Sequence, residues 1–121
     1  GSIMHALKKS DLGFKDFGEI YLSQVKYKTI KGWKRHMRMT MNLVVPVGNV
    51  RFVFYNEENK YFEEYLIGED NYCRLTVNPQ IWFSFQGIGK GKNIVMNIAN
   101  IENDPNEVER KDLLDLEYYW G

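Results

Sequence analysis

Residues 31–55, KGWKRHMRMTMNLVVPVGNVRFVFY, decide the fold of this protein. They are predicted to form two antiparallel β-strands joined at residues 46–49 (PVGN), where proline and glycine mark a turn. Side chains alternate between the two faces of a strand, so the first strand has a polar face and a largely apolar face. Lys34, His36, Arg38, Thr40 and Asn42 share the polar face, and Trp33, Arg35, Met37, Met39, Met41 and Leu43 share the other. Such a strand suits the wall of a small β-barrel whose cavity is lined by the polar row.

Size and charge limit the classes of protein to consider. The 121 residues are enough for one domain and too few for two. Because 16 basic residues balance 16 acidic ones, no net charge favours nucleic acid or an anionic membrane. No apolar run approaches the roughly 20 residues of a membrane-spanning helix. The single cysteine excludes an intrachain disulfide and fits a reducing compartment, so we expect a cytoplasmic protein.

Short strands separated by turn signals are predicted along the rest of the chain. Outside the central stretch, strands are predicted at residues 19–27, 61–67, 72–77, 81–86 and 93–101. Residues 107–116 are predicted to hold one short helix. About eight strands with little helix argue for a β-sandwich or a barrel. Residues 1–3 are interpreted as a cloning remnant, which leaves residues 4–121 as a single domain.

Several segments, in this order, carry a family resemblance: residues 17–25 (FGEIYLSQV), 31–41 (KGWKRHMRMTM), 77–85 (VNPQIWFSF), 100–107 (NIENDPNE) and 118–120 (YYW). In order and spacing they resemble the small cupins related to dTDP-4-dehydrorhamnose 3,5-epimerase and sugar 3,4-ketoisomerase. Such proteins are encoded with deoxysugar, O-antigen and lipopolysaccharide pathways. The resemblance implies an all-β, cupin-type (jelly-roll) β-barrel with one short C-terminal helix.

The chain departs from the family pattern at four polar positions. The first histidine of the family's pair is Lys34, its glutamine is Met39, its acidic residue is Met41 and its later histidine is Phe83, so only His36 remains. A cupin metal site needs about three histidines and a carboxylate. We therefore expect no metal and no other cofactor.

Family members act on nucleotide-linked 4-keto sugars, whose ketone acidifies the neighbouring C–H bond. The resemblance therefore implies a base of near-neutral pKa and a group that stabilises the enolate. His36 is the candidate base, Lys34 the candidate stabilising group and Tyr55 a candidate second acid. The alternative is that His36 is simply a hydrogen-bonded residue of the barrel, beside a solvated Lys34.

Substrate binding would require cations for the diphosphate and aromatic rings for the sugar or base. Arg38 and Arg51, with Lys34, are the candidate phosphate ligands, although each is also explained as a surface charge. Trp33 and Trp82 are candidate stacking residues, although tryptophans beside apolar strands commonly belong to a core.

The sequence thus favours a metal-independent epimerase or ketoisomerase of a nucleotide-linked 4-keto-6-deoxysugar. The alternative is a catalytically silent cupin that binds a sugar nucleotide or a partner enzyme, because the changes at Lys34, Met41 and Phe83 remove groups that usually orient the base. The apolar C-terminal tail (residues 117–120), the N-terminal arm (residues 4–12) and a methionine stripe (Met37, Met39 and Met41) indicate a homodimer. Neither nucleic acid nor a membrane is expected as a partner.

Overall fold

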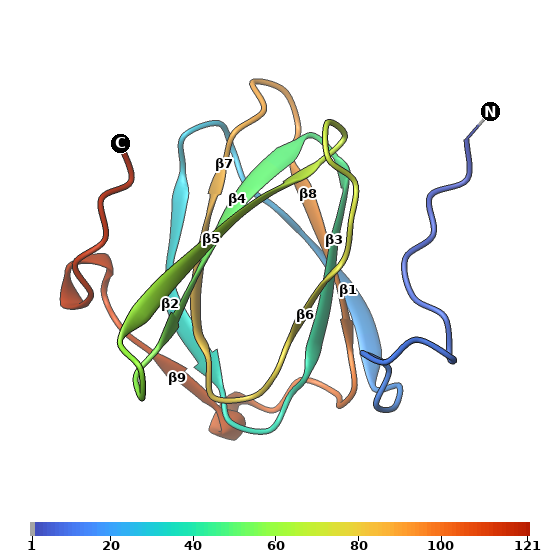
Figure 1. Cartoon of the computed structure of the whole chain (residues 1–121), viewed down its shortest axis with the longest axis horizontal. Helices are drawn as coiled ribbons and strands as arrows, with labels where there is room; N and C mark the ends of the chain where they lie inside the picture. The colour runs from blue at the N-terminus through green and yellow to red at the C-terminus, as the bar shows by residue number, and fades with distance from the viewer. Residues whose placement is uncertain (1) are drawn as a thin grey trace.

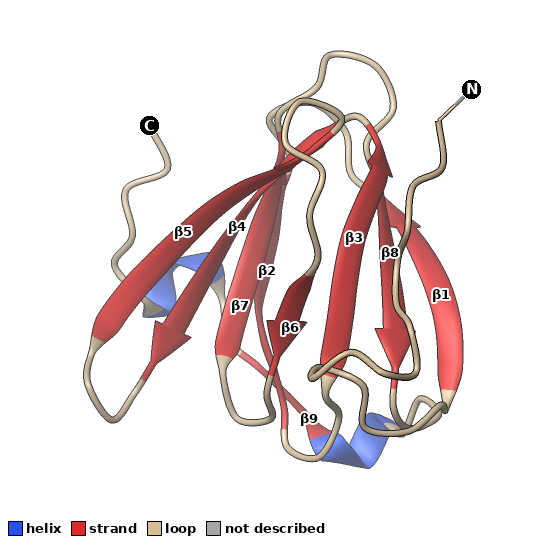
Figure 2. Cartoon of the chain, turned by 45° about the vertical axis from the view of Figure 1, so that its right-hand side comes forward, coloured by secondary structure: helices blue, strands red, loops and turns tan. Residues whose placement is uncertain are grey.

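The computed structural model describes residues 2–121 as two facing antiparallel β-sheets (Figure 1, Figure 2). The four-stranded sheet has the order β1 (Glu19–Gln24), β8 (Ile94–Ala99), β3 (Met41–Val47) and β6 (Leu75–Val77). The five-stranded sheet has the order β5 (Tyr61–Gly68), β4 (Asn49–Asn56), β7 (Trp82–Gly87), β2 (Ile30–His36) and β9 (Val108–Arg110). The predicted all-β, cupin-like architecture is confirmed. Of the predicted cloning remnant, Gly1 lies outside the described residues.

Two finer predictions about the fold need correction. The sheets do not close into a barrel, because β1 and β6 remain the edges of one sheet and β5 and β9 the edges of the other. The short helix predicted in residues 107–116 is replaced by two single-turn 3₁₀ helices, η1 (Pro105–Glu107) and η2 (Leu113–Asp115), with β9 between them. This segment is extended because β9 pairs with β2, and that pairing satisfies its backbone groups.

The central stretch also folds differently from the predicted hairpin. β2 ends at His36, residues 37–40 cross to the opposite sheet, and β3 begins at Met41. Gly48, at φ 78°, then returns the chain to the five-stranded sheet, so β3 and β4 lie in opposite sheets instead of pairing edge to edge. This arrangement buries the apolar side chains of both strands between the sheets.

Two apolar clusters hold the fold together. The larger lies between the sheets and includes Met39, Met41 and Phe52. Met41 also lines a cavity together with Lys34, so the prediction that it faces away from Lys34 is wrong. The smaller cluster centres on Trp33 and Trp82 on the outer face of the five-stranded sheet, where the C-terminal tail covers it. Figure 1 shows this tail and the N-terminal arm on opposite outer sides of the molecule. Within residues 2–121 we find no helix with the length and apolar character needed to span a membrane.

Candidate functional site

A cavity of about 350 Å³ opens between the two sheets. Its apolar wall is formed mainly by Phe52, Phe83 and Phe85, and polar side chains from β1, β2, β8 and β9 complete it. The polar lining residues are Tyr21, Ser23, Gln24, Lys31, Lys34, Asn97 and Arg110. A largely apolar cavity with a few convergent polar groups is typical of a small-molecule site.

The basic side chains gather where β2 and β9 meet. Lys34 and Arg110 are directly opposite each other in the strand register, and both line the cavity together with Lys31. Burial lowers the pKa of Lys34, the positive charge of Arg110 lowers it further, and Glu107 acts in the opposite direction. This wall of the cavity is therefore suited to an anionic group such as a phosphate.

His36 and Glu107 form a buried pair at the end of β2. Their residues are 3% and 4% exposed, and His36 Nδ1 is hydrogen-bonded to Glu107 Oε1. Glu107 Oε2 accepts hydrogen bonds from the backbone N–H groups of Arg38 at 2.9 Å and Met39 at 3.2 Å. An ionised carboxylate can only accept hydrogen bonds, so Nδ1 carries the proton. His36 Nε2 is left as the basic nitrogen, buried and with no hydrogen-bond partner among residues 2–121.

The pKa values of the pair agree with this assignment. Burial lowers the pKa of His36, while the hydrogen bond and the charge of Glu107 oppose that effect. Burial would raise the pKa of Glu107, but the hydrogen bonds from Arg38, His36 and Met39 outweigh it, so the pKa is lowered. The pair therefore consists of a neutral imidazole and a carboxylate at neutral pH. The ring of His36 stacks on Phe83, a cavity residue, with 6.0 Å between the ring centroids.

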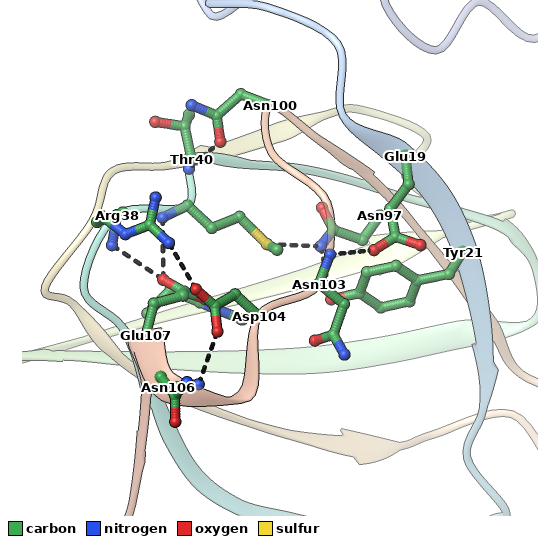
Figure 3. A network of polar contacts seen from close by, with 12 residues as sticks. Glu19, Tyr21, Arg38, Thr40, Asn97, Asn100, Asn103, Asp104, Asn106 and Glu107 are labelled. Atoms are coloured by element: carbon green, nitrogen blue, oxygen red, sulfur yellow. Dashed lines mark hydrogen bonds and ion pairs between the residues drawn. The ribbon is translucent and has the colours of Figure 1, made fainter.

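Tyr21 and Asn97 supply a second polar group on the cavity wall. Asn97 Nδ2 donates a hydrogen bond to Tyr21 Oη at 2.9 Å, which leaves the phenolic proton free for another acceptor (Figure 3). Burial raises the pKa of Tyr21. Asn97 is 3% exposed, and its Oδ1 has no hydrogen-bond partner in the described residues. Both side chains can therefore accept a further polar contact in the cavity.

The same close-up shows what holds Glu107 in place (Figure 3). Asp104 caps η1 by accepting a hydrogen bond from Asn106 N at 2.9 Å, and Arg38 pairs with Asp104 at 2.8 Å. These contacts fix the single turn that carries Glu107, because a 3₁₀ turn this short needs support from side chains.

The two tryptophans and the tyrosine predicted at the site all lie on the opposite face of the five-stranded sheet. Trp33 and Trp82 are 1% and 2% exposed in the outer cluster, and Tyr55 packs against that cluster. Alternation along β2 explains the placement of Trp33, since its neighbour Lys34 points into the cavity. The structure does not bring these three residues together with Lys34.

The two predicted arginines also lie away from the cavity lining. Arg51 donates a hydrogen bond to the backbone carbonyl of Trp120 at 3.0 Å and pairs with Glu64 at 3.1 Å, so it fastens the C-terminal tail. Arg38 is exposed and pairs with Asp104. Of the seven predicted site residues, Lys34 lines the cavity and His36 stacks on its wall.

Sequence reasoning missed Tyr21, Asn97, Glu107 and Arg110 as site residues. Alternation along residues 19–24 separates Tyr21 from Ile20 and Leu22, but only the structure shows that the two apolar residues are exposed and that Tyr21 lines the cavity. Glu107 ends the motif in residues 100–107, but the distance along the chain hides its contact with His36. Within residues 2–121, no group of three or more His, Cys, Asp or Glu side chains is placed to hold a metal ion.

Comparison with known proteins places this chain in a family. No protein-family model and no curated protein matches the sequence. Among solved structures, a dTDP sugar isomerase from Desulfovibrio desulfuricans G20 is 33% identical, with a TM-score of 0.87 over 92% of this chain and 74% of that one. The chain therefore belongs to the cupin-type family of dTDP-sugar epimerases and ketoisomerases, and the predicted resemblance is confirmed.

More distant structures share the fold. QdtA, a sugar 3,4-ketoisomerase from Thermoanaerobacterium thermosaccharolyticum solved in complex with TDP, is 17% identical, with a TM-score of 0.73 over 85% of this chain and 72% of that one. NovW, a 4-keto-6-deoxy sugar epimerase from Streptomyces spheroides, is 13% identical, with a TM-score of 0.72 over 78% of this chain and 51% of that one. At these identities, the likeness supports the cupin-like fold alone.

Proposed function

We propose that this protein is a metal-independent epimerase or ketoisomerase that acts on a nucleotide-linked 4-keto-6-deoxysugar. The observation that carries the proposal is the buried His36–Glu107 pair, which leaves Nε2 of a neutral imidazole without a partner. The imidazole ring stacks on Phe83, which lines the cavity together with three cations. Family membership supports the same chemistry, since a 33% identical relative is a dTDP sugar isomerase.

The reaction begins with removal of the proton next to the ketone. His36 Nε2 accepts this proton while Glu107 stabilises the imidazolium that forms, as a carboxylate does in other histidine pairs. Lys34 withdraws electron density from the carbonyl group. Return of the proton to the other face of the same carbon gives an epimer. Its return to the former carbonyl carbon moves the ketone, provided that the proton of the neighbouring hydroxyl group passes to the former carbonyl oxygen.

Tyr21 is better placed than Tyr55 to be the second acid. Its hydroxyl group faces the cavity and keeps a proton to donate, because the bond with Asn97 uses it as an acceptor. Tyr55 lies in the outer cluster. We assign the diphosphate to Lys31 and Arg110, which line the cavity near Lys34.

Solvent deuterium exchange tests this proposal. Wild-type protein in heavy water, given TDP-4-keto-6-deoxyglucose, is expected to incorporate deuterium at the carbon next to the ketone, as read by mass spectrometry. His36→Ala should reduce the rate by about 10²–10⁴-fold, the range that general-base catalysis contributes. His5→Ala is the matched control, because His5 is the other histidine and lies in the exposed N-terminal arm. Unchanged exchange in His36→Ala would remove His36 from the mechanism.

A catalytically silent sugar-nucleotide binder is the second candidate. Met41 and Phe83 line the cavity at positions where the family carries an acidic residue and a histidine, so the wall is less polar than the family pattern predicts. Calorimetry against dTDP-, UDP-, GDP- and CDP-sugars would show binding for both candidates. Binding without deuterium incorporation would favour the silent binder.

The homodimer is also a proposal. Ile20 and Leu22 on edge strand β1 are 48% and 58% exposed, and Phe17 just before them is 59% exposed. An exposed apolar edge strand is a site where a second copy can pair. Light scattering combined with size-exclusion chromatography is expected to give twice the chain mass, whereas a monomer would contradict this prediction.

A further inference from the structure

Lys34 occupies a position in the sheet that favours a reactive amine. On one side its register partner is Phe83 in β7, and on the other side it is Arg110 in β9. Directly opposite residues on neighbouring strands project from the same face, and all three line the cavity. The amine of Lys34 therefore lies on the cavity wall between an aromatic ring and a guanidinium group.

The charges around Lys34 do not neutralise it. No salt bridge of Lys34 is found among residues 2–121, and the nearby carboxylate of Glu107 is already engaged by His36 and two backbone N–H groups. Burial and Arg110 together lower the pKa of Lys34. Lysines are activated in enzymes by a hydrophobic pocket or by a second cation nearby, and Lys34 has both.

We propose that Lys34 is a nucleophilic amine that binds the ketone of the substrate covalently, as an imine. This inference rests on the proposed function, and it specifies how Lys34 withdraws electrons from the carbonyl group. An iminium nitrogen is a stronger electron sink than a neighbouring ammonium group, because the electrons released from the C–H bond flow into a covalent bond. Lys34 stands where the family carries a histidine, so this chain has at that position a primary amine that can form an imine.

The steps balance without any oxidant or reductant. The neutral amine attacks the carbonyl carbon, the C=O π electrons move to oxygen, and a proton passes from nitrogen to that oxygen. The acid protonates the resulting hydroxyl group, which leaves as water while the nitrogen lone pair forms a protonated C=N bond. The base removes the neighbouring proton, and the electrons move to nitrogen as an enamine. A proton then returns to the other face of the same carbon, which restores the iminium and gives the epimer. Hydrolysis by one water molecule releases the ketone product, the free amine and the proton taken up during dehydration.

Reductive trapping tests this inference. Wild-type protein is incubated with TDP-4-keto-6-deoxyglucose and cyanoborohydride, which reduces iminium groups in preference to ketones, and the products are read by intact mass and peptide mapping. We expect one adduct, on Lys34, with the mass of the ketone less one oxygen atom. Lys34→Arg keeps the charge but cannot form the imine, so it should lose the adduct. Lys92→Arg, a change at an exposed lysine in the turn after β7, should keep it.

The outcomes separate this inference from the function on which it rests. Deuterium incorporation without an adduct would overturn the imine and leave the isomerase proposal standing. An adduct on Lys34 without deuterium incorporation would support the imine and overturn the isomerase proposal. Adducts spread over exposed lysines would overturn the special role of Lys34. A cooperative unfolding transition in Lys34→Arg would show that a lost adduct is not a folding defect.

Discussion

The two faces of the five-stranded sheet differ in how completely the chain itself covers them. Trp33 and Lys34 are neighbours on β2, yet Trp33 is sealed under the C-terminal tail and Lys34 opens onto the cavity. On the outer face, Trp82 Nε1 donates a hydrogen bond to Glu57 at 2.6 Å, and Arg51 is bonded to the tail. The outer face is therefore largely completed by contacts within the chain.

Buried polar atoms without a hydrogen-bond partner lie on both faces of the described chain. His36 Nε2 and Asn97 Oδ1 are on the inner side, and Trp33 Nε1 and Arg51 Nε are on the outer face, where Arg51 Nε lies 3.1 Å from Glu64. A buried polar atom without a hydrogen bond costs about 1–3 kcal/mol of stability. The two faces therefore differ in their cover and not in the number of such atoms. The tail closes the outer face, whereas the inner face keeps a cavity in which a ligand can supply a partner.

The largest expected effect on stability comes from Trp33→Ala. Removing this ring, which is 1% exposed, leaves a void beneath the tail and should lower the free energy of unfolding by about 3–5 kcal/mol. Lys34→Met replaces a half-buried charge by an apolar chain of similar length and should change stability by less than about 1 kcal/mol. Urea unfolding of both variants measures the difference. A greater loss in Lys34→Met would contradict the division of roles between the two faces.

A second prediction concerns the His36–Glu107 pair on the inner face. In Glu107→Gln, an NH2 group replaces one carboxylate oxygen, and this group cannot accept a hydrogen bond. If the amide oxygen keeps the two backbone N–H groups, the NH2 group faces His36 Nδ1. The pair then survives only if His36 takes the other tautomer, with its proton on Nε2. Catalysis should then fall strongly, and the free energy of unfolding should fall by about 2–3 kcal/mol. Nitrogen-15 NMR of the imidazole would show the tautomer directly. An unchanged Nε2 signal would contradict this assignment.

The pH dependence of stability should change in the same variant. The folded-state pKa values of Glu107 and His36 are below their ordinary values of 4.5 and 6.5, so their contributions are present above those values. They are lost as pH falls, because the unfolded chain then binds more protons than the folded one. Glu107 opposes the lowering of the His36 pKa, so between about pH 6.5 and about pH 4.5 Glu107→Gln should lose at least as much stability as wild-type protein. Below about pH 4.5, wild-type protein should lose more, because only it also loses the contribution of Glu107. Equal losses below that pH would show that Glu107 does not make this contribution.

Sequence reasoning was accurate where a local pattern determines structure. The strands at residues 19–27, 61–67, 81–86 and 93–101 correspond to β1, β5, β7 and β8, because apolar alternation and turn residues are local signals. It failed where the chain changes sheets. Nothing in residues 37–40 distinguishes a crossing from a continuous strand, so the predicted polar row from Lys34 to Asn42 is divided between two sheets.

The site shows the same limit. Lys34 and His36 were predicted as site residues because they lie in one short motif, whereas Arg110 and Glu107 reach them only through the pairing of β9 with β2. Tyr55 and Trp82 lie on apolar strands, and only the position of the tail shows which face they occupy. The segment predicted as a helix supplies Glu107 and Arg110, two of the four residues that sequence reasoning missed, so the wrong secondary structure concealed half of them.

A smaller effect should distinguish the arginines of the two faces. Arg110→Met removes a cation from the cavity and should weaken TDP binding about tenfold, close to 1.4 kcal/mol. Arg51→Met removes an outer-face cation that holds the tail, so it should change stability and leave TDP affinity within about twofold. Calorimetric titration with TDP measures both affinities. A larger loss of TDP affinity in Arg51→Met than in Arg110→Met would indicate that the phosphate binds on the outer face.

The smallest effect is expected at the hydrogen bond between Tyr118 in the tail and Glu64. Burial and the hydrogen bond to Glu64 raise the pKa of Tyr118 from its ordinary 10.0 to about 12. The folded chain therefore keeps the phenolic proton after the unfolded chain has lost it, and this contribution to stability declines as pH rises between those two values. Tyr118→Phe should cost about 0.5–1 kcal/mol near neutrality and remove that alkaline decline, as measured by urea unfolding. Because the contact is on the outer face, the same variant should leave deuterium incorporation unchanged. A loss of incorporation would show that the tail influences the cavity through the sheet, and the two faces would then no longer be independent.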